Sequence, residues 1–201
     1  MNIVIEEIYN LIEAIIVTWF ITSYFKTKSK FHHKMVKFLS FALIAVQINI
    51  VSILGLHWIF TMIISSISLL GISTLLLKGT HSERLVISST AILLLALSDI
   101  CAFTLIGKLL GVDYKLLVVD NTFSRFLAVS TSKVLYLIIA SVILFFKKKY
   151  SIFIHKRETV LIVITLLISG LQISLIRNII YEQRQYYNIF LVVLLCVLSL
   201  N

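Results

Sequence analysis

The chain alternates long hydrophobic segments with short polar clusters, and this alternation predicts membrane-spanning helices. Seven hydrophobic segments can be separated, at residues 8–25, 37–56, 59–77, 85–106, 124–146, 159–177 and 187–201. A helix needs about 20 apolar residues, with a range of about 17 to 25, to cross the hydrocarbon core, and the first six segments meet this length. Barrel strands would instead give alternating segments of about ten residues. The sequence therefore predicts an all-α, polytopic transmembrane bundle of six or seven helices, forming a single domain over residues 1–201.

The last hydrophobic segment is shorter than the others. It ends at Asn201 and is still apolar at Leu198 and Leu200. We therefore expect the chain to stop inside or at the edge of its last span, as a fragment or a truncated protein would.

Composition and charge agree with a membrane protein. Hydrophobic residues make up 60% of the chain and charged residues 13%, whereas a soluble domain is about 45–50% apolar. A net charge of +9 would indicate nucleic-acid binding in a soluble protein. Here the basic residues form short clusters between hydrophobic segments, which the positive-inside rule explains. We expect a multi-pass protein of the bacterial cytoplasmic membrane, in contact with lipid and without a nucleic-acid partner.

The distribution of basic residues predicts an orientation. Twelve of the 18 lysine and arginine residues lie in or beside the links that follow the first, third and fifth segments. Five lie in or beside the other links, and Lys133 lies within a segment. The side with more basic residues should be cytoplasmic. This prediction places the N-terminus outside and, with seven spans, the C-terminus in the cytoplasm.

Three ionisable residues, Glu13, Asp99 and Lys133, lie inside predicted spans. A charge at bilayer depth costs at least about 2.5–3.5 kcal/mol on insertion scales, so such residues usually have a partner or a function. In the predicted orientation all three lie about 8–13 Å below the external surface, at about 1.5 Å per residue. We expect Lys133 to pair with either Asp99 or Glu13. The alternatives are a Glu13 in the headgroup region, a Lys133 that snorkels to the interface and a protonated Asp99 that only bonds another helix.

Further polar residues are predicted on the external side. Three amides in the outer halves of the spans are candidates for interhelical hydrogen bonds: Gln47, Asn49 and Gln172. Four residues in or beside the external segment 108–124 are candidate ligand contacts: Asp113, Tyr114, Asp120 and Arg125. Together with the three intramembrane charges, these residues would line a polar cavity that opens outward.

The sequence gives little support for a catalytic site or a metal site. The five histidines are scattered over different links, and Cys101 and Cys196 lie in apolar segments without a Cys-x-x-Cys pair. His81 and Cys101 belong to one predicted helix, about 30 Å apart at about 1.5 Å per residue, which is too far for a cysteine nucleophile and its base. We therefore expect no catalytic residue, no metal and no cofactor.

Four segments of the chain carry a resemblance to a known family. The first is LIEAIIVTWF, which contains Glu13, and the second is the basic link KTKSKFHHK. The third is LLLKGTHSERLVISSTAILLLALSDI, which contains Asp99, and the fourth is RFLAVSTSKVLYLI, which contains Lys133. In this order they resemble the sensor half of GHKL-type histidine kinases of the accessory-gene-regulator type, over nearly all 201 residues. Relatives are expected to carry glutamate in place of Asp99, so the shorter aspartate leaves the partner of Lys133 open.

The resemblance implies a receptor domain that detects a secreted peptide and passes a conformational change to a cytoplasmic dimerisation helix and kinase. The kinase motifs are absent from these 201 residues, so we expect no enzymatic activity and a homodimer that forms through the missing C-terminal part. The leading hypothesis is a sensor domain for an extracellular peptide or another small signal. The alternative is a small transporter or substrate-binding membrane subunit, in which Glu13, Asp99 and Lys133 would line a substrate or proton path. A peptide-processing membrane protease is a third hypothesis.

Overall fold

Helices make up nearly all of the part of the chain that the computed structural model describes, which is residues 3–28, 33–54, 58–112, 117 and 123–149. They are α1 (Ile3–Tyr24), α2 (His33–Leu54), α3 (Trp58–Leu76), α4 (His81–Leu110) and α6 (Phe123–Lys149). Each of the first five hydrophobic segments thus corresponds to one helix, and the predicted all-α class is confirmed for the described residues. The predicted segments 159–177 and 187–201 lie outside them, so a total of six or seven helices stays a prediction.

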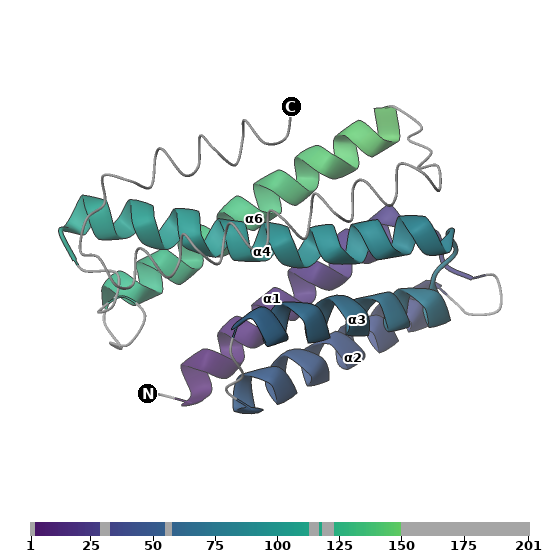
Figure 1. Ribbon diagram of the computed structural model, residues 1–201, viewed down its shortest axis with the longest axis horizontal. Coiled ribbons are helices and arrows are strands. Elements are labelled where there is room, and N and C mark those ends of the chain that lie inside the picture. Colours follow the sequence, from purple (N-terminus) through teal and green to yellow (C-terminus); the bar gives the residue numbers. More distant parts are fainter. Residues whose placement is uncertain (1–2, 29–32, 55–57, 113–116, 118–122, 150–201) are drawn as a thin grey trace.

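Contacts join the five described helices into a closed ring, and Figure 1 shows how these helices lie in the bundle. Around the ring, α1 packs on α2, α2 on α3, α3 on α4, α4 on α6, and α6 on α1, while α1 also contacts α4. The N-terminal ends of α1, α3 and α6 lie together with the C-terminal ends of α2 and α4. We call this the cavity end of the bundle, and the opposite end the basic end. The closed ring allows side chains from all five helices to meet in its interior.

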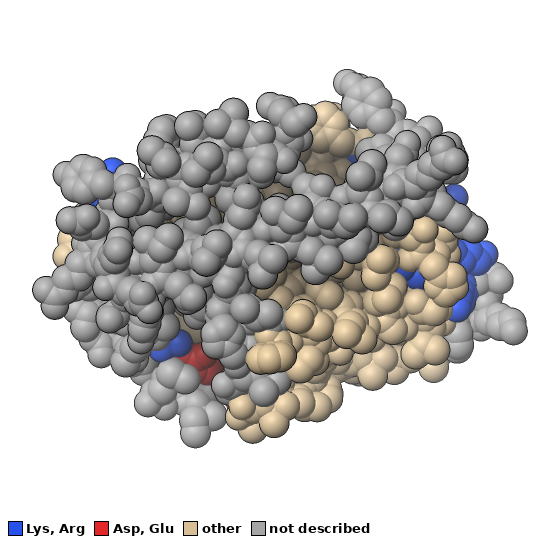
Figure 2. Space-filling model, viewed as in Figure 1, with Lys and Arg blue, Asp and Glu red and all other residues tan. Residues whose placement is uncertain are grey.

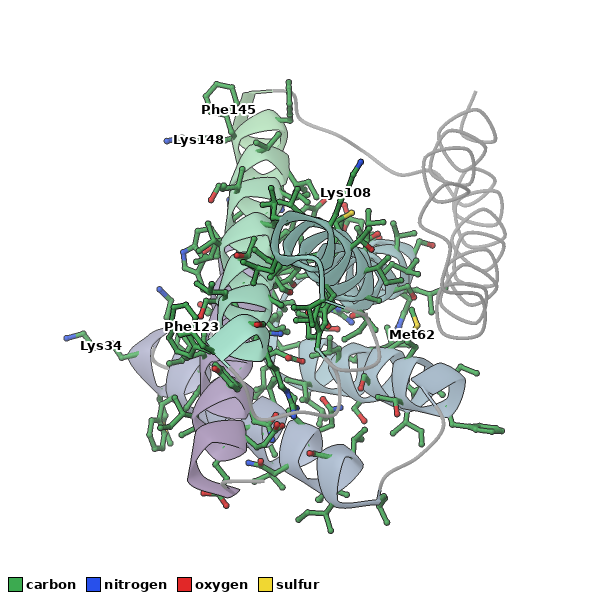
Figure 3. All side chains as sticks on the ribbon, turned by 90° about the vertical axis from the view of Figure 1, so that its left-hand side faces the viewer. Lys34, Met62, Lys108, Phe123, Phe145 and Lys148 are labelled. Atoms are coloured by element: carbon green, nitrogen blue, oxygen red, sulfur yellow. The ribbon has the colours of Figure 1, made fainter. Side chains whose placement is uncertain are left out.

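Basic residues concentrate at the basic end. Figure 2 shows lysine and arginine gathered on the right, where α4 begins and α6 ends. Along α6, Phe123 and Lys148 lie near opposite ends of the helix (Figure 3). The described basic residues of this end are Lys26, Lys28, Lys34, Lys37, Lys78, Arg84, Lys147 and Lys148. The asymmetry of charge predicted from the sequence is therefore also an asymmetry between the two ends of the folded bundle.

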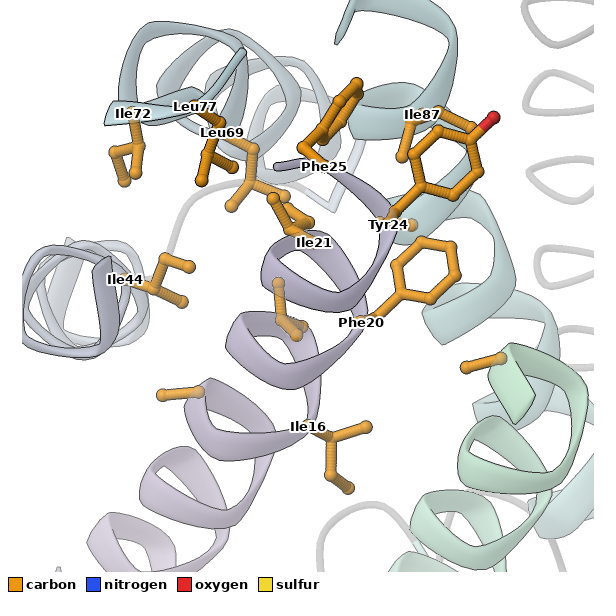
Figure 4. Close-up of a cluster of buried hydrophobic side chains, with 14 of the residues drawn as sticks. Ile16, Phe20, Ile21, Tyr24, Phe25, Ile44, Leu69, Ile72, Leu77 and Ile87 are labelled. Atoms are coloured by element: carbon orange, nitrogen blue, oxygen red, sulfur yellow. The ribbon is translucent and has the colours of Figure 1, made fainter. Parts of the chain in front are cut away.

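A cluster of buried hydrophobic side chains holds α1 against its neighbours (Figure 4). Phe20 and Ile21 of α1 are buried, as are Ile44 of α2, Leu69 of α3 and Ile87 of α4, and all five belong to one cluster. In lipid, helices gain no stability from excluding water, so dense van der Waals packing must hold them together. This cluster fixes the C-terminal half of α1, between Glu13 and the basic end.

Several small residues of α4 and α6 are fully buried. Ala128 and Ala140 of α6 are fully buried, as is Ser132 between them, and Ala91 and Ala102 of α4 are fully buried as well. Ala128 and Ser132 lie four positions apart and share one face of α6, and Ser132 bonds Asp99 of α4. Small side chains let two helix backbones approach closely. The polar residues beside this face are consequently held at a fixed distance from α4.

Helix α4 is longer than its predicted span of 85–106, because caps rather than hydropathy set its ends. At its start Thr80 accepts a hydrogen bond from the Glu83 amide, and the Glu83 carboxylate accepts one from the Thr80 amide. This reciprocal arrangement satisfies amides that the helix leaves unpaired. At its end Gly111 has φ 63° and its N–H donates to the Gly107 carbonyl. A left-handed residue of this kind is usually glycine.

Three of the described helices are long and apolar enough to cross a membrane. They correspond to Lys34–Leu54, His81–Leu110 and Phe123–Lys148, and Phe60–Leu76 is a shorter apolar helix. Large apolar side chains are exposed on the outside of the bundle, including Ile53 (84% exposed) and Phe38 (71% exposed) of α2. A soluble protein rarely exposes such surfaces. Length, composition and exterior are therefore those of a membrane protein.

Candidate functional site

Lys133 lies between two carboxylates from two other helices. Its ammonium is 2.9 Å from Glu13 Oε2 on α1 and 3.6 Å from Asp99 Oδ1 on α4. The neighbouring hydroxyl of Ser132 donates a hydrogen bond to the same oxygen of Asp99. The sequence left open which acid pairs with Lys133, and the structure has both contacts. We call Glu13, Asp99 and Lys133 the charged triad.

The triad forms because its members lie at one depth in the bundle. Glu13 comes ten residues after Ile3, Lys133 ten residues after Phe123, and Asp99 eleven residues before Leu110. At about 1.5 Å per residue, each is about 15 Å from the end of its helix. A desolvated ammonium next to two carboxylates reduces the cost of burying all three charges.

A second ion pair joins α1 and α6 closer to the cavity end. Arg125 of α6 donates to the Glu6 carboxylate of α1. Glu6 and Glu13 are seven residues apart, and Arg125 and Lys133 are eight apart, so each pair lies on one face of its helix. Because α1 and α6 run in the same direction, the two acids of α1 face the two cations of α6. Opposite charges thus fix the register of these helices at two levels.

Neutral hydrogen bonds connect α2 to both of its neighbours. The Asn10 amide donates to Asn49 Oδ1 over 3.0 Å, which links α1 to α2. The Gln47 amide donates to the Ser65 hydroxyl over 2.7 Å, which links α2 to α3. Gln47 and Asn49 therefore make the interhelical hydrogen bonds for which the sequence made them candidates.

These polar groups surround a cavity of about 340 Å³. All five helices contribute to its walls. The polar and charged lining residues are Glu6, Tyr9, Asn10, Glu13, Gln47, Thr61, Ser65, Asp99, Arg125 and Lys133. The remaining wall is apolar and consists of residues such as Ile48, Met62, Leu95 and Phe103. A cavity of this volume, mostly apolar with a few converging polar groups, is typical of sites for small ligands.

Most of the predicted intramembrane residues meet at this cavity. Five predicted residues line it: Glu13, Gln47, Asp99, Arg125 and Lys133. Asn49 contributes by accepting the hydrogen bond of Asn10, which is itself a lining residue. Four predicted residues lie outside the described part of the chain: Asp113, Tyr114, Asp120 and Gln172. Whether the lining residues bind a signal stays a prediction.

Among the residues of the site that were not predicted are Glu6 and Ser65, which line the cavity, and Ser132, which bonds Asp99. Glu6 looked like an external acid, although its spacing of seven residues from Glu13 places both on one face of α1. Ser65 lies in an apolar segment, and its part in the site is visible only from the hydrogen bond that it accepts from Gln47 of α2. Ser132 precedes Lys133 in sequence, but a serine in a helix more often bonds its own backbone. Its bond to Asp99 follows from the close approach of α4 and α6.

At the basic end, lysine and arginine side chains bind backbone carbonyls. The Lys147 ammonium donates to the Tyr24 carbonyl at the end of α1, and lies 3.4 Å from the centroid of the Tyr24 ring. Lys28 donates to the Thr74 carbonyl of α3 over 2.6 Å. A cation over an aromatic ring is stabilised by the ring's quadrupole, and the last carbonyls of a helix attract positive charge.

A buried arginine completes the contacts of the basic end. Arg84 is 7% exposed and donates to the Leu77 carbonyl, just after α3, over 3.0 Å. Leu77 also forms an isolated antiparallel bridge with Thr27, the residue three positions after α1. These basic residues therefore have structural roles in addition to the topological role that the sequence predicted.

Cys101 and His81 belong to the same continuous helix, α4. Twenty residues separate them, which corresponds to about 30 Å at about 1.5 Å per residue. The helix therefore holds the thiol and the imidazole apart. Within the described residues, His, Cys, Asp and Glu form no group of three or more that could hold a metal ion.

Comparisons with known proteins give no match for this chain, whether against protein-family models, curated proteins or solved structures. The cavity and the charged triad are therefore interpreted from their own geometry and from the resemblance in sequence described above.

Proposed function

We propose that this chain is the membrane receptor domain of a peptide-sensing histidine kinase of the accessory-gene-regulator type. In this proposal it is a multi-pass protein of the bacterial cytoplasmic membrane, with six or seven spans. The basic end faces the cytoplasm, following the positive-inside rule, and the cavity end faces the outside. The signal is a secreted peptide or another small extracellular molecule. The kinase and the dimer contacts belong to a cytoplasmic part beyond these 201 residues.

One observation carries this proposal: Lys133 lies at a cavity and contacts carboxylates of two other helices, Glu13 on α1 and Asp99 on α4. A membrane anchor has no use for three charges at this depth, since each is costly in lipid. A cavity lined by several helices, with charges that hold those helices together, is suited to sensing. A ligand that enters it can change contacts between helices without breaking the fold.

The mechanism would be a shift between two helix arrangements. A ligand stabilises whichever arrangement it binds more tightly, and only this difference in affinity can move the equilibrium. Helix α6 connects the two ends of the bundle, since Lys133 contacts Glu13 and Asp99 at the cavity and Lys147 contacts the Tyr24 carbonyl. Fourteen residues separate these lysines, about 21 Å along a helix. A small movement of α6 at the cavity would therefore change its contact with α1 at the basic end.

A small transporter is the second candidate, and the same triad favours it. Carboxylates and an ammonium beside an intramembrane cavity also occur on proton and substrate paths. In that case Glu13 or Asp99 would bind and release protons or substrate during transport. Lys133 would pair with the carboxylate that has released its proton or substrate.

The coding sequence beyond the codon for Asn201 and a flux assay distinguish the two candidates. The receptor proposal expects the reading frame to continue into a dimerisation helix and an ATP-binding domain. It also expects proteoliposomes containing the chain to show no proton flux above empty liposomes, measured with an internal pH-sensitive dye. A stop codon beside a transport ATPase gene, or a proton flux that Lys133→Met abolishes, would overturn the receptor proposal in favour of the transporter.

A further inference from the structure

The charged groups of the cavity do not balance. Three carboxylates line it, from Glu6, Glu13 and Asp99, but only two cations, Arg125 and Lys133, are present among its described lining residues. Two carboxylates have close cationic partners, because Arg125 contacts Glu6 and Lys133 lies 2.9 Å from Glu13. Among the described lining residues, one negative charge is therefore left over.

The surplus charge resides mainly on Asp99. Its contact with Lys133 is the longer one, at 3.6 Å, and its side chain is 43% exposed, compared with 20% for Glu13. Ser132 and Lys133 both approach the same oxygen, Oδ1. Among the described residues, no hydrogen bond or ion pair involves Oδ2, so this oxygen is available to a donor that enters the cavity.

Apolar side chains line the same cavity as Asp99. Phe103 lies one turn further along α4 and lines the cavity, as do Leu95 on the same helix and Met62 on α3. An uncompensated carboxylate between apolar walls attracts a cation more strongly than one in water, because the local dielectric constant is low. An aromatic ring near the carboxylate adds a second favourable contact for a cation.

We propose that the cavity binds a positively charged group on an apolar body, such as the amine of a small ligand or of a peptide side chain, with Asp99 as the counter-ion. The inference rests on the proposed function, because it assigns a charge and a shape to the signal that would enter this cavity. A ligand with a carboxylate at this position would be repelled. The volume of about 340 Å³ limits the bound group to a small molecule or one or two side chains of a larger ligand.

Charged thiol reagents test the inference on the chain in lipid nanodiscs. Ala96 lines the cavity one turn before Asp99, and Ala96→Cys is introduced together with Cys101→Ser and Cys196→Ser. The labelling rates of cationic trimethylammonium-ethyl and anionic sulfonato-ethyl methanethiosulfonate are each divided by the rate with a free thiol. A negatively charged cleft concentrates cations about tenfold or more, so the cationic reagent should react at least about tenfold faster.

Three further variants locate the charge that causes this preference. Asp99→Asn should bring the two normalised rates close to each other, whereas Asp99→Glu, which keeps the charge, should preserve the preference. Glu7→Gln is the matched control, because Glu7 is an exposed acid of α1 outside the cavity lining. It should leave the ratio unchanged. Phenylethylammonium at millimolar concentration should slow labelling of Cys at position 96, and the anion 3-phenylpropanoate should not.

The possible failures are distinguishable. Equal rates for both reagents, or faster labelling by the anion, would overturn the charge preference and leave the proposed receptor function standing. Protection by phenylpropanoate rather than phenylethylammonium would do the same. Labelling by neither reagent would mean that the cavity is closed to water, and the proposed function would fail with the inference. A ratio that responds equally to Asp99→Asn and Glu7→Gln would show that overall charge, not Asp99, causes the preference.

Discussion

The two ends of this bundle use the same kind of residue in two different ways. At the cavity, Lys133 contacts the carboxylates of Glu13 and Asp99, so its partners are charged. At the basic end, Lys147 contacts the Tyr24 carbonyl and the face of the Tyr24 ring, so its partners are neutral. Both lysines belong to α6, and both bind α1. The difference lies in what remains when the lysine is removed.

Loss of the ammonium has unequal consequences at the two ends. At the cavity it would leave two carboxylates without their cation in an environment of low dielectric constant. At the basic end the loss of Lys147 would leave only a neutral carbonyl without this donor. An uncompensated charge in a bundle interior is much more costly than a neutral carbonyl without its donor. The charged triad should therefore respond to mutation as a unit, whereas the contacts of the basic end should act singly.

The largest effect is expected for Lys133→Met. Breaking a buried ion pair by removing one partner typically costs about 3–5 kcal/mol, because the other charge stays buried and unpaired. We expect the free energy of unfolding to fall by about 3 kcal/mol or more. The measurement is unfolding by sodium dodecyl sulfate in mixed micelles, followed by circular dichroism.

The triple variant Glu13→Gln, Asp99→Asn, Lys133→Met is the control for this prediction. It removes all three charges, and replacing a complete buried ionic group by neutral residues is often nearly neutral. It should therefore be more stable than Lys133→Met alone. If the triple variant were less stable than the single one, or if Lys133→Met had no effect, the triad would not act as a unit.

A smaller loss is expected for Lys147→Met at the basic end. The variant removes a charged donor from the end of α1 and a cation from the Tyr24 ring, which are each worth about 0.5–1 kcal/mol. We expect a decrease of about 1 kcal/mol in the same unfolding assay. Lys148→Met is the matched control, since Lys148 is exposed on the next position of α6 and should change stability little. Equal effects of the two substitutions would show that charge near the end of α6, rather than the contact with Tyr24, is responsible.

The contrast between the ends also explains how much of the structure the sequence could predict. Apolar segments determine where helices form, so α1, α2 and α3 agree with the predicted spans to within a few residues. The depth of Glu13, Asp99 and Lys133 follows from the same segments, which is why their meeting could be expected. A pair of Lys133 with either acid was predictable, because a charge in lipid needs a partner, but the contact with both acids was not.

The contacts of the basic end were less predictable, because a charge beside water can stay solvated without any protein partner. Lys147 was expected only to help determine topology, and nothing near it in the sequence indicates a contact with the Tyr24 carbonyl, 123 residues earlier in the chain. The same holds for Arg84, whose burial depends on how the start of α4 follows the end of α3. Such contacts depend on which helices are neighbours, and hydropathy does not contain that information. The predicted orientation of the bundle in the membrane remains a prediction.

The smallest expected effect concerns the neutral hydrogen bond between Asn10 and Asn49, which lies beside the charged triad. Hydrogen bonds between membrane helices contribute about 0.6 kcal/mol on average in double-mutant cycles. We expect a coupling of about this size between Asn10→Ala and Asn49→Ala in the unfolding assay.

A cycle of Glu13→Gln with Lys133→Met in the same assay gives the comparison, and its coupling should be several times larger. Both cycles join residues of α1 to a neighbouring helix at the cavity end, so they differ mainly in charge. A coupling between the asparagines as large as that of the charged pair would mean that depth in the bundle, and not charge, determines the strength of these contacts. The distinction between the triad and the rest of the polar network would then be lost. A coupling near zero for the asparagines would show that, of the two contacts compared, only the charged pair holds α1 to a neighbouring helix.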